Sequence, residues 1–97
     1  FKKLKRGQYV IERELDLHGL TVAEAKPVLH EFIQNCFHYG KRCVRIIHGK
    51  GHGSKNKLPV LKNKVNQWLK LDDRVLAFCS ARANDGGTGA IYVLIKK

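Results

Sequence analysis

A strand, a capped helix and a second strand follow one another early in this chain, and this succession constrains the fold more than any other feature. Residues 15–18 alternate apolar and polar side chains, which predicts a half-buried strand. Thr21 and Glu24 have the spacing of a capping box, so a helix is expected to begin there and to end near Gly40. Residues 43–47 are apolar and rich in β-branched side chains, and they predict the second strand. A crossover of this kind makes the two strands parallel.

The rest of the chain predicts one further helix and two further strands. The helix is expected to have Pro59 in its first turn, and its buried stripe comprises Leu61, Val65, Trp68 and Leu69. Residues 74–81 and 90–95 predict strands, and the glycine-rich residues 84–89 between them predict a turn. The order β-α-β-α-β-β predicts a single α/β domain.

Positive charge is concentrated in the middle of the chain. The formal net charge is +11, from 19 Lys and Arg against 8 Asp and Glu, and no acidic residue lies between Glu31 and Asp72. A face of one sign attracts a polyanion, for which nucleic acid is the usual identity, although lysines kept for solubility are the alternative. The basic residues that we expect to contact phosphates are Arg45, Lys50, Lys55, Lys57 and Lys62.

Other features of the sequence narrow the cellular setting. The three cysteines form no Cys-x-x-Cys pair and lie in apolar segments, which indicates buried thiols in a reducing compartment. No apolar run is long enough to span a membrane, so a membrane partner is not expected. The chain begins at Phe1 and contains no methionine, so we expect it to be part of a longer cytoplasmic protein. No apolar helical stripe is left over for a partner, and a monomer is expected.

Polar residues follow both predicted parallel strands where each strand ends. Asp16 and His18 share one face of the first strand because side chains repeat every two residues. His48-Gly49-Lys50-Gly51 follows the second strand. Ligands of open α/β sheets bind beyond the carboxyl ends of the strands, so these two segments are expected to meet at one edge. If the strand over residues 74–81 also runs parallel, the turn containing Gly87 borders the same site.

These residue types suit the cleavage of a phosphodiester. The reaction needs a base, an acid for the leaving oxygen, and groups that stabilise the charge on phosphorus. Histidine as a residue type can serve as acid or base near neutral pH, so His18 and His48 are the candidate acid–base groups, while Asp16 orients His18 or binds a divalent cation. Glycines allow backbone N–H groups to approach a phosphate closely. The alternative is that the histidines are ordinary surface residues and that the glycines only form turns.

Three segments together resemble the Smr (small MutS-related) domain over roughly residues 14–97: Leu15-Asp16-Leu17-His18-Gly19, His48-Gly49-Lys50-Gly51 and Gly86-Gly87-Thr88-Gly89. The resemblance is nearest to the stand-alone bacterial Smr proteins. It implies a two-layer α/β sandwich, with a four-stranded mixed sheet and two helices on one face, and endonuclease activity on nucleic acid. The family's functional acid and histidine carry over to Asp16 and His18, and its loop histidine to His48. Residues 1–13 lie outside the match and are expected to form a basic arm.

Several functions stay open on the sequence alone. The first is an endonuclease of low sequence specificity that nicks DNA, with no tightly bound cofactor and at most a transient Mg²⁺ at Asp16. The second is an RNA endonuclease that uses the 2′-hydroxyl as nucleophile and acts on ribosome-associated RNA. The third is a binding module that uses its lysine-rich face on nucleic acid, or on the ribosome, without chemistry.

Overall fold

The fold is described by a computed structural model that covers residues 1–49 and 60–97. Its helices and strands follow the order α1 (Lys2–Lys5), β1 (Arg13–Asp16), α2 (Val22–His38), β2 (Cys43–Ile47), α3 (Val60–Leu71), β3 (Val75–Ser80) and β4 (Ala90–Ile95). Two 3-10 turns, η1 (Ala83–Asp85) and η2 (Gly87–Gly89), connect β3 to β4. The predicted β-α-β-α-β-β order is confirmed from β1 onward. Within the two described ranges, no helix has the length and hydropathy to cross a membrane.

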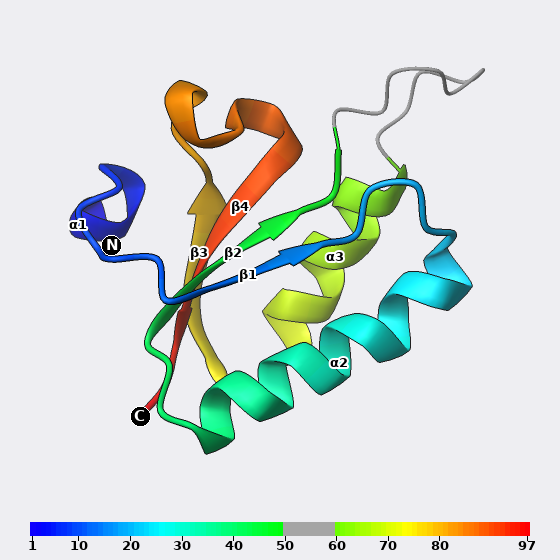
Figure 1. The fold of residues 1–97 in the computed structure, drawn as a ribbon, viewed down its shortest axis with the longest axis horizontal. Helices are drawn as coiled ribbons and strands as arrows, with labels where there is room; N and C mark the ends of the chain where they lie inside the picture. The colour runs from blue at the N-terminus through cyan, green and yellow to red at the C-terminus, as the bar shows by residue number, and fades with distance from the viewer. Residues whose placement is uncertain (50–59) are drawn as a thin grey trace.

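The four strands form one mixed sheet in the order β1-β2-β4-β3 (Figure 1). β1 and β2 are parallel, as a crossover through α2 predicts. β4 is antiparallel to both β2 and β3. As a result, β3 runs in the same direction as β1 and β2, although β4 separates it from them. The carboxyl ends of β1, β2 and β3 therefore lie at one edge of the sheet, which is the arrangement that the sequence predicted.

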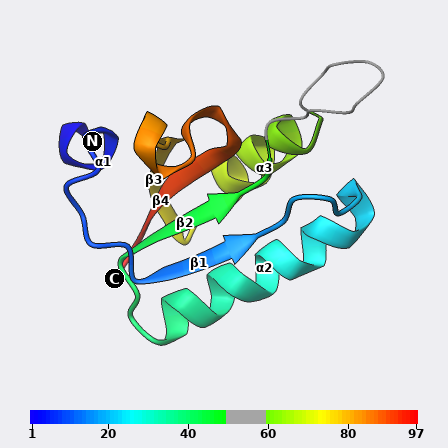
Figure 2. The ribbon, with the colours of Figure 1, turned by 45° about the horizontal axis from the view of Figure 1, so that its top comes forward.

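α2 and α3 cover one face of the sheet (Figures 1 and 2), which confirms the predicted two-layer α/β sandwich. Their apolar stripes pack against alternate strand residues, and the buried core between the layers comprises Leu17, Ala25, Leu29, Ile33, Cys36, Val44, Ile46, Val65, Leu69, Ile91, Val93 and Ile95. Trp68 is partly buried against this core, as its place in the stripe predicts.

α2 has a well-defined beginning and end. The Thr21 hydroxyl accepts the Glu24 N–H at 3.1 Å and the Glu24 carboxylate accepts the Thr21 N–H at 2.9 Å, which confirms the capping box. The helix continues through Pro27 and ends before Gly40, whose φ of +70° lies in the left-handed region. The Lys41 N–H then donates to the Cys36 carbonyl at 2.8 Å, which satisfies one of the last carbonyls of the helix.

The opposite face of the sheet is covered by the N-terminal segment, the part of the chain that was expected to form a basic arm. Leu4 of α1 is only 1% exposed and packs with Cys43, Ala81, Ala90, Tyr92 and Leu94. β4 is a central strand, so its outward side chains also need an apolar cover. The Arg82 guanidinium donates to the Arg6 carbonyl at 3.1 Å and helps to hold this segment in place. Figure 2 shows α1 and α2 on opposite sides of the sheet.

The cysteines are free thiols, as the sequence predicted. Cys36 lies in the core between helices and sheet, and Cys43 lies on the α1 face. Burial raises the pKa of the Cys43 thiol to about 11, so this side chain behaves as a small apolar group.

Candidate active site

Backbone hydrogen bonds join the three segments that the sequence singled out. The Leu17 N–H donates to the Ile47 carbonyl at 2.6 Å, which ties the end of β1 to the end of β2. The N–H groups of His48 and Gly49 both donate to the Gly89 carbonyl, at 3.0 and 3.1 Å. The loop after β2 is thereby held against the turn before β4. The predicted convergence of the three segments at one edge is confirmed for the residues that the structure describes.

Asp16 and His18 form a hydrogen-bonded pair at this edge. Asp16 Oδ1 lies 2.6 Å from His18 Nδ1 and also accepts the His18 N–H at 3.0 Å. These bonds lower the pKa of the Asp16 carboxyl, so it is ionised at neutral pH. A carboxylate only accepts, so the neutral imidazole carries its proton on Nδ1 and leaves the Nε2 lone pair free to act as a base. The His18 side chain is 70% exposed, so a substrate can reach it.

His48 differs from His18 in being buried, with only 5% of its surface exposed. Its Nδ1 lies 2.7 Å from the Gly49 carbonyl, and this acceptor fixes the proton of the neutral ring on Nδ1. Its Nε2 is buried and has no hydrogen-bond partner among residues 1–49 and 60–97. Burial lowers the pKa of His48, as does the positive charge of Lys62 on α3. The ring is therefore neutral at pH 7, with an unused acceptor nitrogen.

Gly49 brings the second segment into contact with the first. Its φ is +86°, a backbone conformation that residues other than glycine rarely adopt. A Cβ at this position would stand 3.3 Å from the His18 Cβ, which is tighter than an ordinary contact. The backbone of the loop after β2 therefore packs directly on the candidate base, and glycine permits this approach.

The residues that were expected to bind phosphates lie in surroundings that differ from one residue to the next. Lys50, Gly51, Lys55 and Lys57 lie outside the described residues. Lys62 is half-buried on α3, close enough to His48 to shift its pKa. The N–H groups of Gly49 and Gly87 were expected to face a phosphate, but they donate to the carbonyls of Gly89 and Arg82 at 3.1 and 2.9 Å. Both N–H groups are therefore used within the fold, and a phosphate contact of these glycines stays a prediction.

Arg45, another expected phosphate-binding residue, is paired with acidic residues in the structure. Its side chain lies on the α1 face of the sheet, where Nε donates to Glu14 Oε2 at 2.8 Å and Nη1 donates to the Asp85 carbonyl at 3.4 Å. The hydroxyl of Tyr92 bonds to the carboxylate of Asp85. This guanidinium is paired with Glu14 and Asp85, and it lines a pocket together with Gly49. Its contact with a phosphate stays a prediction. The pairing with Glu14 follows from the parallel register, in which Glu14 and Arg45 are cross-strand partners.

The donor atoms near Asp16 are few for a bound metal ion. Within the described ranges, no group of three His, Cys, Asp or Glu side chains is arranged to hold one. Asp16 Oδ1 already accepts two hydrogen bonds, which leaves Oδ2 as its free oxygen. A Mg²⁺ ion at this carboxylate would depend on water and substrate oxygens for its other ligands.

Comparison with known sequences identifies relatives across the whole chain. The family model for the Smr domain matches residues 15–96. "Probable DNA endonuclease SmrA" of Escherichia coli is 38% identical over 95 residues, which cover 98% of this chain and 51% of that protein. "Ribosome rescue factor SmrB" of Tolumonas auensis is 42% identical over 96 residues, which cover 99% of this chain and 52% of that protein. The chain thus spans about half the length of the curated relatives it matches.

Solved structures show the same fold. The stand-alone small MutS-related protein YdaL of Escherichia coli superposes with a TM-score of 0.85 at 38% identity, over 99% of this chain and 73% of that chain. The Smr domain of Thermus thermophilus MutS2 gives a TM-score of 0.78 at 33% identity, over 88% of this chain and 99% of that domain. The resemblance to stand-alone bacterial proteins that the motifs indicated is confirmed.

Proposed function

We propose that this chain, which belongs to the Smr domain family, is a nucleic-acid endonuclease. The observation that carries the proposal is the Asp16–His18 pair, at 2.6 Å, on the edge where the ends of three strands meet. An exposed imidazole held by an ionised carboxylate is a competent general base. The chain's charge of +11 supplies the attraction for a polyanionic substrate.

In this proposal the His18 Nε2 takes the proton from the attacking oxygen. The Asp16 carboxylate holds the ring through Nδ1 and stabilises the imidazolium that forms, so Asp16 is a positioning residue. His48 is the candidate second acid–base group. Because burial lowers its pKa, it accepts a proton or a hydrogen bond rather than acting as a charged acid.

We take DNA nicked at low sequence specificity as the first substrate. Lysine contacts to phosphates carry no sequence information, which is consistent with low specificity. The name of the Escherichia coli relative, a probable DNA endonuclease, supports this choice. DNA must be attacked by water, so a transient Mg²⁺ at Asp16, completed by water and substrate oxygens, would supply charge stabilisation when bound.

RNA is the second candidate substrate, and one observation favours it. The site offers an imidazole and a single carboxylate, and RNA brings its own nucleophile, the 2′-hydroxyl. A base such as His18 suffices for that attack. The Tolumonas auensis relative is named a ribosome rescue factor, which supports ribosome-associated RNA as the substrate in this version.

The deciding experiment compares cleavage of supercoiled plasmid and of single-stranded RNA, each with magnesium or with chelator. The wild-type chain is tested beside His18→Ala and a control, His30→Ala, which removes an exposed histidine from α2. We expect His18→Ala to lower the rate by roughly 10²–10⁴-fold and His30→Ala to leave it unchanged. Nicking that requires magnesium assigns DNA, and RNA cleavage in chelator assigns RNA.

A binding module would behave differently in the same experiment. It would cut neither substrate, or His18→Ala would cut as well as wild type. Either result would overturn the endonuclease proposal.

A further inference from the structure

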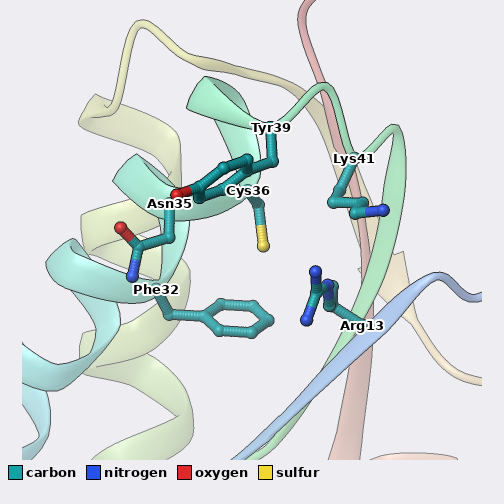
Figure 3. Close-up of a pocket in the computed structure, with 6 residues that line it drawn as sticks. All are labelled: Arg13, Phe32, Asn35, Cys36, Tyr39 and Lys41. Carbon is teal, nitrogen blue, oxygen red and sulfur yellow. The ribbon is translucent and has the colours of Figure 1, made fainter.

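A pocket of about 290 Å³ lies at the opposite end of α2 from His18. It is lined by Arg13, Phe32, Asn35, Cys36, Tyr39 and Lys41 (Figure 3). Arg13 is the first residue of β1, and Asp16 is the last. α2 begins just after His18 and returns along β1 to this pocket. The pocket and the candidate active site therefore lie at the two ends of the same strand–helix pair.

The residues that form the pocket are held by the fold. Phe32 is partly buried against the core, so its ring has a fixed position. The backbone of Arg13 is paired with Val44 in the sheet. Lys41 follows the turn at Gly40, and its N–H is bonded to the Cys36 carbonyl at 2.8 Å. The Phe32 ring and the backbone of Arg13 and Lys41 are therefore in place before a ligand binds, which lowers the entropic cost of binding.

The lining combines two cations with two aromatic rings. Neither Arg13 nor Lys41 forms an ion pair with a residue of the described ranges. Tyr39 is 68% exposed. Figure 3 shows its ring across the pocket from the ring of Phe32, with Arg13 and Lys41 together beside the two rings. Glu12 is an acidic residue close enough to the pocket to affect the pKa of the Cys36 thiol. Its carboxylate already accepts the Arg42 N–H at 2.8 Å.

We propose that this pocket binds one nucleotide of the substrate strand, with its base against Phe32 and Tyr39 and its phosphate between Arg13 and Lys41. Cations beside flat aromatic faces are the combination by which proteins hold single-stranded nucleic acid. The exposed amide of Asn35 adds donors and an acceptor for a base edge. The proposal rests on the endonuclease function above and extends it with a subsite remote from the cleavage point.

The distance between the pocket and His18 indicates how many nucleotides separate the bound nucleotide from the scissile phosphate. His18 is five positions after Arg13, and five extended residues span at most about 17 Å. A stacked strand advances about 3.4 Å per nucleotide, so the bound nucleotide lies about five nucleotides from the scissile phosphate. An oligonucleotide of about three nucleotides cannot reach both places, whereas one of about twelve can.

The test measures oligonucleotide affinity by fluorescence anisotropy, in a His18→Ala background that prevents cleavage. The probes are single-stranded oligodeoxyuridine and oligouridine of both lengths, which differ only in the sugar. The subsite variant is Tyr39→Ala with Lys41→Gln. Its matched control is Phe1→Ala with Lys2→Gln, which removes one exposed aromatic ring and one charge from the α1 side of the sheet. The probe that binds more tightly shows whether the subsite prefers deoxyribose or ribose.

We expect the subsite variant to weaken binding of the longer probe about fivefold or more, as the loss of one stacked base does. The slope of log affinity against log salt should fall by about 0.7 for the lost phosphate contact. The control should show neither change, and the short probe, which can still bind at the candidate active site, should lose less affinity than the long probe. Affinity for the long probe that stays at the control level would overturn the subsite, including the case in which the pocket serves a protein partner. Equal weakening of both probe lengths would overturn the proposed spacing between the pocket and His18.

This readout is separate from cleavage. If the wild-type chain cuts no nucleic acid but the length-dependent loss is seen, the endonuclease proposal fails and the nucleotide pocket stands as part of a binding module. If the chain cuts and the loss is not seen, the subsite fails alone.

Discussion

Asp16 Oδ1 lies 2.6 Å from His18 Nδ1 and accepts the His18 backbone N–H as well, at 3.0 Å. One carboxylate oxygen thus holds both the ring and the backbone of a residue two positions along the chain. β1 ends at Asp16 and His18 lies in the turn that follows, so the bond from the His18 N–H to the Asp16 carboxylate is the contact of an Asx turn. This arrangement leaves the His18 Nε2 directed away from its carboxylate partner and available to substrate.

Replacing Asp16 with Asn should lower the cleavage rate about tenfold or more. The amide can still accept a hydrogen bond but carries no charge to stabilise the imidazolium, and charge-assisted bonds are roughly twice as strong as neutral ones. Asp73→Asn, at an exposed carboxylate after α3, is the control. The measurement is kcat against pH for both variants. A rate for Asp16→Asn equal to that of Asp73→Asn would show that the pair has no catalytic role.

His48 should make the stability of the fold depend on pH near neutrality. Burial lowers its folded-state pKa below the unfolded value of about 6.5. Between the two pKa values the unfolded chain binds more protons, so the free energy of unfolding decreases as pH falls through about 6.5 and levels off below the folded pKa. The lowered pKa of Asp16 affects stability only at more acidic pH, since its contribution is lost as pH falls below about 3.9.

Urea denaturation between pH 5 and 8, on wild type and His48→Asn, checks this window. Asparagine retains a side-chain N–H for the Gly49 carbonyl but does not titrate. The variant should therefore show a flatter pH dependence over that range. An unchanged slope would mean that His48 is not the titrating group.

Two glycine substitutions separate backbone strain from the placement of His18. Gly19 and Gly49 have φ values of +82° and +86°, so alanine should cost about 1–2 kcal/mol at either position. A Cβ at Gly19 meets nothing within 4 Å, whereas one at Gly49 meets the His18 Cβ at 3.3 Å. We expect Gly49→Ala to reduce cleavage further than Gly19→Ala at equal loss of stability. Thermal denaturation and cleavage rates, measured together, check this, and matched activities would contradict it.

Substitutions of Arg45 and Lys62 should distinguish a cation that stabilises the fold from one that binds a phosphate. Arg45→Gln removes the bonds to Glu14 and Asp85 and should cost about 1–3 kcal/mol of stability, with the salt dependence of nucleic-acid binding unchanged. Lys62→Gln should lower that salt dependence by about one phosphate contact and leave stability within about 0.5 kcal/mol of wild type. Urea denaturation and salt titrations of affinity measure both quantities. A reversed pattern would identify Arg45 as a phosphate ligand.

The elements of this fold are encoded locally, which is why the sequence predicts them well. The capping box at Thr21, the glycine stop at Gly40 and the stripes of α2 and α3 each depend on residues within one or two turns of each other. The strand β2 and the strand β4 were predicted with the bounds that the structure has. The first strand was predicted over residues 15–18, but β1 spans Arg13–Asp16, so Asp16 and His18 pair through the turn after the strand and not through a shared strand face.

Partners from distant parts of the chain were decided only by the tertiary structure. The order β1-β2-β4-β3 sets Arg45 between Glu14 and Asp85, and it gives the N–H of Gly49 to Gly89. It also creates the apolar face that Leu4 covers, and it brings Tyr39 beside Arg13. The sequence by itself determined α2, α3 and the four strands, because short-range periodicity and capping specify them, and it brought Asp16 and His18 together because they are two positions apart. The partners of Arg45, the cover over β4 and the pocket at the end of α2 needed the folded chain, because each depends on which strands become neighbours in space.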